Sequence, residues 1–420
     1  MIENLYSIEI KEFVMTFRYK IKCNTCGRNI LVRFGMGYTE FQECEFKCDQ
    51  CSSDIKFSIT AKPPQAIIDY LENCSYSDFQ DSLFPDDNKK YLIKNFHQDF
   101  LSTKKDGFFY SVLELNKILE KRFSYSGSAE GVLVANFTFL EKNWRIVKQA
   151  WQMKNNNNNN FIEDVLKKYE SITIEGVCGF EDILFDFNNT VLAPECLKYN
   201  KIAEKLVQEY KSKKSKRKEF LKLMEYYRDN LMVDHMEKFF NIYSDFFDLY
   251  NDFRPFLMYT NHKLDINLDI NIANHNFHRT KMFYGNLYEA YTSNIIFISL
   301  LHNIHKGRRF DEFCNLTLSK YCGLDKSKKT ENFKNTEMFI FFDDFLTNKL
   351  RNASHHGNIK MIDNDVLEYK SGKESLKRYT MHYGRYMQIC VELFIRFVSL
   401  LQLEICFFYI FNKKIKSDLK

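Results

Sequence analysis

Two pairs of cysteines near the N-terminus have the spacing of a metal-binding site. Cys23 and Cys26 form one CxxC pair, and Cys48 and Cys51 form a second pair after an interval of 21 residues. Two such turns can present four thiolates to one tetrahedral Zn²⁺ ion. Because a four-thiolate site has no open position for a substrate, we expect the zinc to be structural and no metal to be catalytic. Cys44 leaves an alternative open, since it either replaces Cys48 as a ligand or packs in the interior.

A second group of residues with chemical potential lies near the C-terminus, at the end of a predicted helix. An apolar stripe with helical spacing runs through Phe339, Phe342, Leu346, Leu350 and Ala353. Arg351, Asn352, His355 and His356 follow on the polar side, and Gly357 is a stop signal just beyond them. Arginine can neutralise phosphate charge, and histidine can exchange a proton near neutral pH. The pattern therefore favours chemistry on a phosphate ester.

This segment resembles the HEPN domains, whose ribonuclease members carry Arg, a polar residue and a His near the end of a bundle helix. Arg351, Asn352 and His356 match that motif, and the resemblance covers roughly residues 275 to 412. It implies a helical bundle and metal-independent cleavage of RNA through the ribose 2′-hydroxyl, which leaves a 2′,3′-cyclic phosphate. His355 competes with His356 for the role of catalytic base, and Asp344 is a candidate supporting group.

The resemblance also implies partners. Two motifs from paired domains usually form one composite cleft in this family, so a homodimer is expected. Members frequently act as toxins or antiviral defence effectors that cut RNA. The competing hypothesis is a non-catalytic sensor that binds RNA or nucleotide through the bundle and recognises a regulatory protein or nucleic acid through the cysteine module. Degradation of RNA in the presence of EDTA separates the two.

The elements that position these residues are predominantly helical. Five Pro and 14 Gly in 420 residues favour long helices over a turn-rich β architecture. Period-two alternation is confined mainly to the N-terminus, so we expect a zinc ribbon over residues 1–61, with helical spacing from Pro63 onward. A mostly helical middle region follows over 62–265, with an exposed Asn-rich loop at 154–160. A HEPN-like helical domain covers 266–420, and the overall fold class is mainly α.

The composition also excludes several classes of protein. Charged residues in the first 13 positions argue against a secretory signal, so a cytoplasmic location is expected. The most apolar segment, Met387 to Phe411, is interrupted by Glu392, Arg396 and Glu404, which predicts a buried helix rather than a membrane span. A net charge of +5 is too small to identify a nucleic-acid-binding protein by bulk charge alone.

Three further clusters have two interpretations each. The basic run at 211–218 is a solvated helix face or a phosphate-binding patch. Arg228 and His235 repeat the bare Arg-His pattern; they either form a second active site or have no catalytic role. His302 and His305 have two interpretations: they line a path for RNA together with the cations that follow them, or they lie at a solvated helix end. The cations are Lys306, Arg308 and Arg309.

Overall fold

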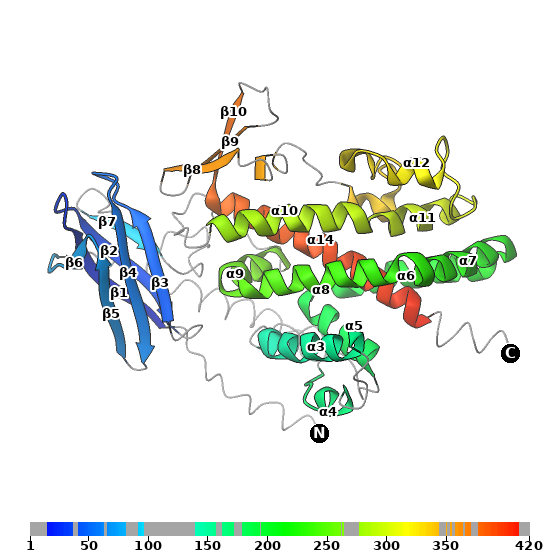
Figure 1. Cartoon of the computed structure of the whole chain (residues 1–420), viewed down its shortest axis with the longest axis horizontal. Helices are drawn as coiled ribbons and strands as arrows, with labels where there is room; N and C mark the ends of the chain where they lie inside the picture. Colours follow the sequence, from blue (N-terminus) through cyan, green and yellow to red (C-terminus); the bar gives the residue numbers. More distant parts are fainter. Residues whose placement is uncertain are drawn as a thin grey trace.

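The computed structural model separates strands from helices along the molecule. It describes residues 15–36, 41–62, 65–80, 91–95, 139–156, 162–171, 179–193, 195–261, 263, 277–343, 350, 353–354, 358–363, 366–370 and 377–410. The N-terminal strands lie at one end and the helices fill the rest, with the small sheet β8 to β10 above them (Figure 1). The prediction of a small β region followed by a mainly helical chain is confirmed.

The N-terminal region consists of two small sheets. The first has the strand order β6-β1-β2-β7, and the second has the order β3-β4-β5. Apart from the parallel pair of β2 and β7, the neighbouring strands are antiparallel. The bounds are β1 Met15–Cys23, β2 Asn29–Met36, β3 Phe41–Lys47, β4 Asp54–Lys62, β5 Gln65–Glu72, β6 Cys74–Tyr76 and β7 Leu92–Asn95. Alternating apolar side chains from both sheets, such as Ile21, Val32 and Phe57, form one buried core.

The helical spacing predicted from Pro63 onward is wrong for residues 65–76. These residues form β5 and β6, and the predicted boundary at residue 61 falls inside β4. The physical reason is visible in β5, where Ile68 packs against the core and pairs with Ile59 of β4, while Ile67 is 45% exposed. Burial therefore alternates with period two, and the β-branched isoleucines suit a sheet. Pairing with the preceding strand, β4, outweighed the helical spacing within the segment itself.

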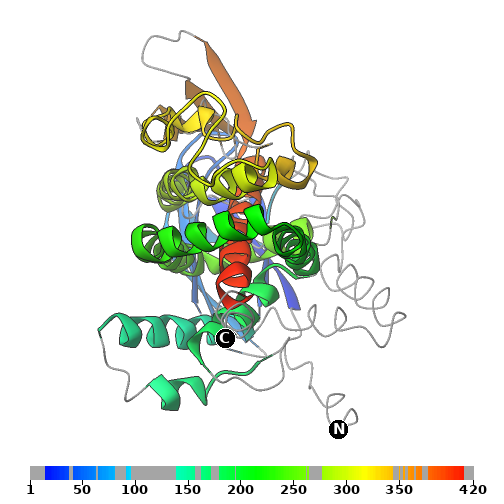
Figure 2. The ribbon, with the colours of Figure 1, turned by 90° about the vertical axis from the view of Figure 1, so that its right-hand side faces the viewer.

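The helical region is organised around its last helix. The helices are α3 Phe139–Asn155, α4 Ile162–Leu166, α5 Phe180–Val191, α6 Cys196–Ser212, α7 Lys214–Asn230, α8 Met232–Asp248, α9 Tyr250–Asn261, α10 Phe277–Asn294, α11 Ile296–His305, α12 Leu318–Cys322 and α14 Tyr383–Ile410. Looking along α14, Figure 2 shows it in the middle with the other helices around it. It packs against α5, α6, α9 and α10. A helix that is apolar on all sides needs such a central position.

Specific contacts fix α14 in place. The rings of Phe246 in α8 and Phe394 in α14 are stacked with their centroids 3.8 Å apart. The amide of Asn188 in α5 donates to Gln402 Oε1 at 2.7 Å and to the carbonyl of Val398 at 3.1 Å. Buried amides must be hydrogen-bonded, so this pairing favours one register of α14 over the alternatives. Buried residues on both sides of the predicted boundary at residue 265 belong to one continuous core.

The prediction of a buried helix at Met387 to Phe411 is confirmed for the residues that the structure describes, since α14 is buried along its length. No helix in the described ranges has the length and apolarity that crossing a membrane requires. The sequence pattern also predicts that this helix starts near Glu374; that prediction is wrong, because α14 begins at Tyr383, directly after a strand. That strand belongs to a three-stranded antiparallel sheet of β8 Ile359–Asp363, β9 Val366–Lys370 and β10 Arg378–His382.

Two other predicted features differ from the structure. The helix expected through the apolar stripe begins as the 3-10 helix η6, Glu337–Phe342, and resumes as helix at residues 350 and 353–354. The Asn-rich loop expected at 154–160 starts later, because α3 continues through Asn155. Residues 157–160 lie outside the described ranges.

Candidate metal centre and Arg-His motif

The four cysteines of the predicted site occupy two turns of the same design. The first turn follows β1 and contains Cys23 and Cys26, and the second follows β3 and contains Cys48 and Cys51. The residue after each pair, Gly27 or Ser52, has a positive φ of 75° or 60°. Its amide donates to the carbonyl of the first cysteine, at 2.8 Å from Gly27 to Cys23 and 2.9 Å from Ser52 to Cys48. Each backbone turn thus aims two sulfurs in one direction.

The sulfur positions suit one tetrahedral ion. The Sγ atoms of Cys23 and Cys51 are 3.7 Å apart, those of Cys26 and Cys48 are 3.6 Å apart, and all four lie within 4.8 Å of one another. Four sulfurs at ~2.3 Å from a central ion would be separated by about 3.8 Å. The predicted cluster of Cys23, Cys26, Cys48 and Cys51 is therefore confirmed as a candidate metal site.

The structure decides between the alternatives for Cys44. Its side chain is fully buried in β3, opposite Phe57 of β4, and is part of the apolar core. Burial raises the pKa of its thiol well above the ordinary value. Cys48, not Cys44, belongs to the group of four.

The thiols of the candidate site differ in how readily they lose a proton when no metal ion is bound. Burial raises the pKa of Cys48 to about 12. The hydrogen bonds with the side chain and backbone of Ser53 lower the pKa of Cys51 to about 6. Since a metal binds the thiolate, binding at neutral pH must release the proton of Cys48, and affinity must fall as the pH falls.

A residue that the sequence did not reveal supports the site. The amide of Asn73, between β5 and β6, donates to Cys23 Sγ at 3.6 Å and to the carbonyl of Asp54 at 3.1 Å. Its Oδ1 accepts a hydrogen bond from Thr25 within the first turn at 2.8 Å. Asn73 has a φ of 51°, which asparagine adopts more readily than most residues. It therefore ties the first turn to the second sheet and stabilises the charge on a candidate ligand.

The predicted catalytic group cannot be placed in the same way. Arg351, Asn352, His355, His356 and Asp344 lie outside the described residues. Their described neighbours are buried, because Leu350 is 2% and Ala353 is 0% exposed, as are Phe339 and Phe342 at 0%. The hydroxyl of Ser354 lies 3.3 Å from that of Tyr386 in α14. The apolar stripe is thus confirmed as a core face at its described positions, and Leu346 lies outside them.

The second Arg-His pair does not form a site. His235 is 1% exposed, and its Nδ1 lies 2.8 Å from Glu404 in α14, which also accepts a hydrogen bond from Tyr227 at 2.5 Å. Arg228 is on the surface in an ion pair with Asp229. The histidine faces the core and the arginine faces solvent, so they cannot act on one phosphate.

The two histidines of α11 also have different environments. His302 is 3% exposed, hydrogen-bonded to Thr336 at 3.1 Å, and burial lowers its pKa to about 4. It therefore lines no open RNA path. His305 is at the surface, where its Nδ1 lies 2.8 Å from Glu209.

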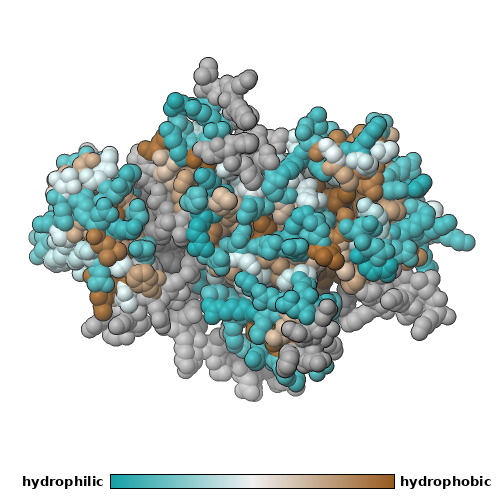
Figure 3. Space-filling model, viewed as in Figure 1, coloured by the Kyte–Doolittle hydropathy of each residue, from teal (hydrophilic) through white to brown (hydrophobic). Residues whose placement is uncertain are grey.

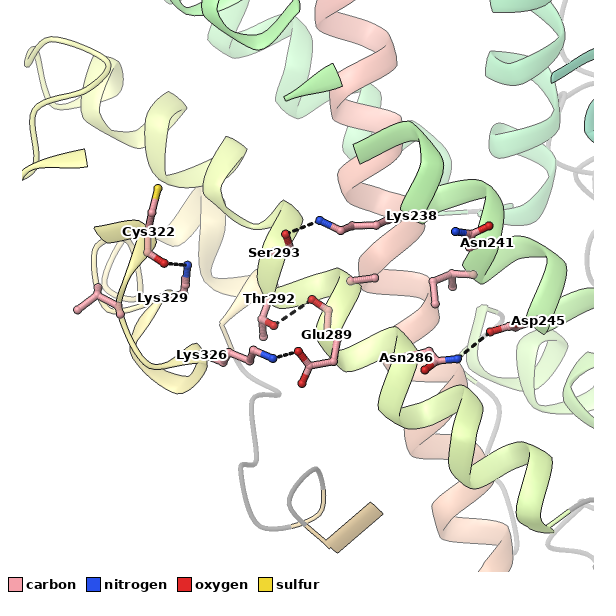
Figure 4. Close-up of a pocket in the computed structure, with 13 residues that line it drawn as sticks. Lys238, Asn241, Asp245, Asn286, Glu289, Thr292, Ser293, Cys322, Lys326 and Lys329 are labelled. Atoms are coloured by element: carbon pink, nitrogen blue, oxygen red, sulfur yellow. Dashed lines mark hydrogen bonds and ion pairs between the residues drawn. The ribbon is translucent and has the colours of Figure 1, made fainter. Parts of the chain in front are cut away.

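A cavity of about 550 Å³ lies between α8, α10 and the segment after α12 (Figure 4). Its lysines already have partners. Lys238 donates to Ser293 at 2.7 Å, Lys326 pairs with Glu289, and Lys329 donates to the carbonyl of Cys322 at 2.9 Å. The carboxylate of Glu289 is thus engaged in an ion pair with a lysine of the same cavity.

Comparison with known proteins adds no relative, since no family model, curated protein or solved structure matches the chain. The family resemblance therefore rests on the motif at 351–356 and the helical context around it. The metal centre rests on geometry instead.

Proposed function

We propose that the chain is a metal-independent endoribonuclease whose catalytic groups are Arg351, Asn352 and His356. The observation that carries the proposal is the burial of Leu350 and Ala353, which bracket Arg351 and Asn352 in the sequence. In a helical pattern, residues between two such core positions belong to the opposite, polar face. The resemblance to HEPN domains then assigns chemistry to that face.

The proposed reaction uses the RNA itself as the nucleophile. His356 would accept the proton of the ribose 2′-hydroxyl or donate one to the leaving 5′-oxygen. Arg351 would stabilise the charge that grows on the phosphate, and Asn352 would orient both groups. The 2′-oxygen forms a bond to phosphorus as the bond to the 5′-oxygen breaks, which leaves a 2′,3′-cyclic phosphate. DNA lacks the nucleophile and would be spared. His355 remains the competing base.

The resemblance also supports a homodimer, because one chain carries one motif and the composite cleft needs two. The helical region would then be a HEPN-like bundle. A toxin or antiviral effector acting on RNA in the cytoplasm is the biological role that this activity suggests.

We further propose that the ion held by the four cysteines is zinc and that its role is structural. Four cysteine sulfurs in tetrahedral positions suit Zn²⁺, and a closed set of ligands leaves no place for a substrate. The ion would hold together two hairpin turns, one from each of the two sheets. The module that it stabilises is the candidate surface for a regulatory protein or nucleic acid.

The test of the proposed reaction is an RNA substrate of defined sequence with single 2′-O-methyl groups, incubated with the protein in EDTA. We expect cutting to stop only at the modified position and the products to end in a cyclic phosphate. Cutting next to a 2′-O-methyl group, or only after magnesium is added, would exclude this mechanism. RNA binding without any cutting would favour the non-catalytic sensor.

A further inference from the structure

Two basic segments that are far apart in the sequence meet on one surface of the helical region. The first is KSKKSKRK at 211–218, which spans the end of α6 and the first residues of α7, and the second is HKGRR at 305–309, at the end of α11. Lys216 joins them, because its ammonium group donates to the carbonyl of His305 at 2.5 Å. Glu209 pairs with Lys216 and with His305 Nδ1. We call the exposed part the basic surface; its cations are Lys211, Lys213, Lys214, Arg217, Lys218, Lys306, Arg308 and Arg309.

Positive charge is concentrated here to an unusual degree. The 13 residues of the two segments contain nine Lys and Arg and no Asp or Glu. The other 51 of the 60 Lys and Arg residues are outnumbered by the 55 Asp and Glu. The chain is therefore net positive only because of these segments. The tip of the molecule at α7 is accordingly hydrophilic in Figure 3.

The acidic residues beside the surface are engaged in holding it together. Glu209 bridges the two segments, as described above. Glu219 pairs with Lys222 at 2.7 Å and accepts from the amide of Phe310 at 3.4 Å. Asp311 pairs with Arg309 at 2.9 Å. Five exposed cations form no ion pair with any residue in the described ranges: Lys211, Lys213, Lys214, Lys218 and Lys306.

Two further features favour a polyanion over a folded protein as the ligand. The two segments themselves offer no apolar centre, because neither contains a large hydrophobic residue. Protein interfaces usually need such a centre. In addition, α7 begins at Lys214 without a side-chain cap, so the positive end of its dipole adds to the field.

We propose that the basic surface binds the phosphate backbone of RNA without reading its sequence. The choice of RNA over DNA rests on the proposed ribonuclease function, since cations alone do not distinguish the two. The run at 211–218 and the cations after His305 then act as one phosphate-binding site, whereas the sequence presented them as separate clusters. Binding through phosphates must weaken steeply with salt.

The test uses a fluorescent 20-nucleotide 2′-O-methyl RNA, which the proposed mechanism cannot cut, so binding is measured apart from catalysis. The basic-surface variant is Lys213→Glu/Lys214→Glu/Lys306→Glu. The matched control, Lys148→Glu/Lys168→Glu/Lys320→Glu, makes the same change of charge outside the two segments. Three lost phosphate contacts should reduce the slope of log K against log salt by about 2 and weaken binding about 50-fold at 0.15 M salt, while the control loses at most threefold.

A second variant with Gln at the same three lysines guards against an artefact of charge reversal and should show the same reduction in slope. The proposal would be overturned if the basic-surface variant and the control lost the same amount of RNA affinity. It would also be overturned if the slope of log K against log salt were unchanged in both the Glu and the Gln variants of the basic surface. Binding to anionic phosphatidylserine vesicles in the absence of RNA binding would overturn it as well. If unmodified RNA binds through this surface but is never cut, the proposed ribonuclease function is refuted, whereas the proposal that the basic surface binds RNA still stands.

Discussion

The N-terminal strands and the helical region bury their apolar surface in different ways. The core of the strands comprises eleven buried residues, and four of these are cysteines: Cys23, Cys44, Cys48 and Cys74. The core of the helices is a continuous cluster that runs from Leu140 to Phe407 and is rich in stacked aromatic rings. A core as small as the first rarely stabilises a domain alone, whereas the second is ample. From this comparison we expect that an ion at the candidate site would matter for the stability of the N-terminal strands and not for that of the helices.

The largest effect should follow from removing one ligand. Cys48→Ser deletes a thiolate of the candidate site, so the chain should bind no ion, and the strands of residues 15–95 should lose their protection from hydrogen exchange. A structural zinc site contributes on the order of 10 kcal/mol, which exceeds the stability of most small domains. The helices should keep their protection. Mass spectrometry measures both quantities: the number of ions bound per chain and the hydrogen exchange of each segment.

Cys44→Ser is the control for that experiment, because Cys44 is buried beside the site without belonging to it. It should retain one ion per chain. The opposite pattern, with the ion lost in Cys44→Ser and kept in Cys48→Ser, would reassign the fourth ligand.

The next largest effect should come from the aromatic core of the helices. Phe246→Ala removes a ring that is stacked on Phe394 of α14, and cavities of this size cost about 3–5 kcal/mol. Urea unfolding should show this decrease in the free energy of unfolding of the helices, and the number of ions bound per chain should not change. Val233→Ala in the same helix is the control, since Val233 is 71% exposed and should cost less than ~0.5 kcal/mol. Release of the ion by Phe246→Ala would show that the two regions are coupled.

A smaller effect should distinguish the regions by pH. His302 has a pKa of about 4 in the folded chain against 6.5 in the unfolded chain, so between these values the unfolded state binds the extra proton. The stability of the helices should therefore fall by about 2–3 kcal/mol as the pH drops from 6.5 to 4. His302→Asn keeps a hydrogen-bonding group that does not titrate and should flatten this dependence. The exposed His278→Asn should leave it unchanged, and an equally steep curve in His302→Asn would refute the assignment.

The smallest effect concerns the support of the metal centre. Asn73→Gly keeps the positive φ but removes the amide that contacts Cys23 Sγ, and loss of such a contact typically weakens metal affinity 10- to 100-fold. Competition with a chromophoric chelator measures the change. Ser52→Gly also replaces a residue of positive φ and should bind the ion as tightly as the natural chain. Equal affinities in the two variants would mean that Asn73 serves the fold alone.

Local patterns predicted the parts of this molecule that depend on local spacing. The two CxxC turns, the first strands and the buried helix α14 were all visible as short-range periodicity. Strand β5 and the sheet of β8 to β10 were missed, because their residues are decided by partners across a sheet rather than by neighbours in the chain.

The candidate sites show the same division. The ligands Cys23, Cys26, Cys48 and Cys51 could be named from their spacing, but Asn73 could not, since it reaches Cys23 from 50 residues away. Similarly, the pairing of Arg228 with His235 looked plausible until burial placed them on opposite faces. The joining of 211–218 with 305–309 depends on Lys216 and Glu209, whose contacts span about 90 residues.

The central claim, cleavage of RNA by the Arg-His motif, is tested most directly by comparing the initial cutting rates of five chains in EDTA. Arg351→Ala and His356→Ala should each cut at least ~100-fold more slowly than the natural chain, and His355→Ala should lose less. Unchanged circular dichroism and one bound ion per chain would show that the fold persists. Cutting that continues at the natural rate in the Arg351→Ala/His356→Ala double variant would contradict the account.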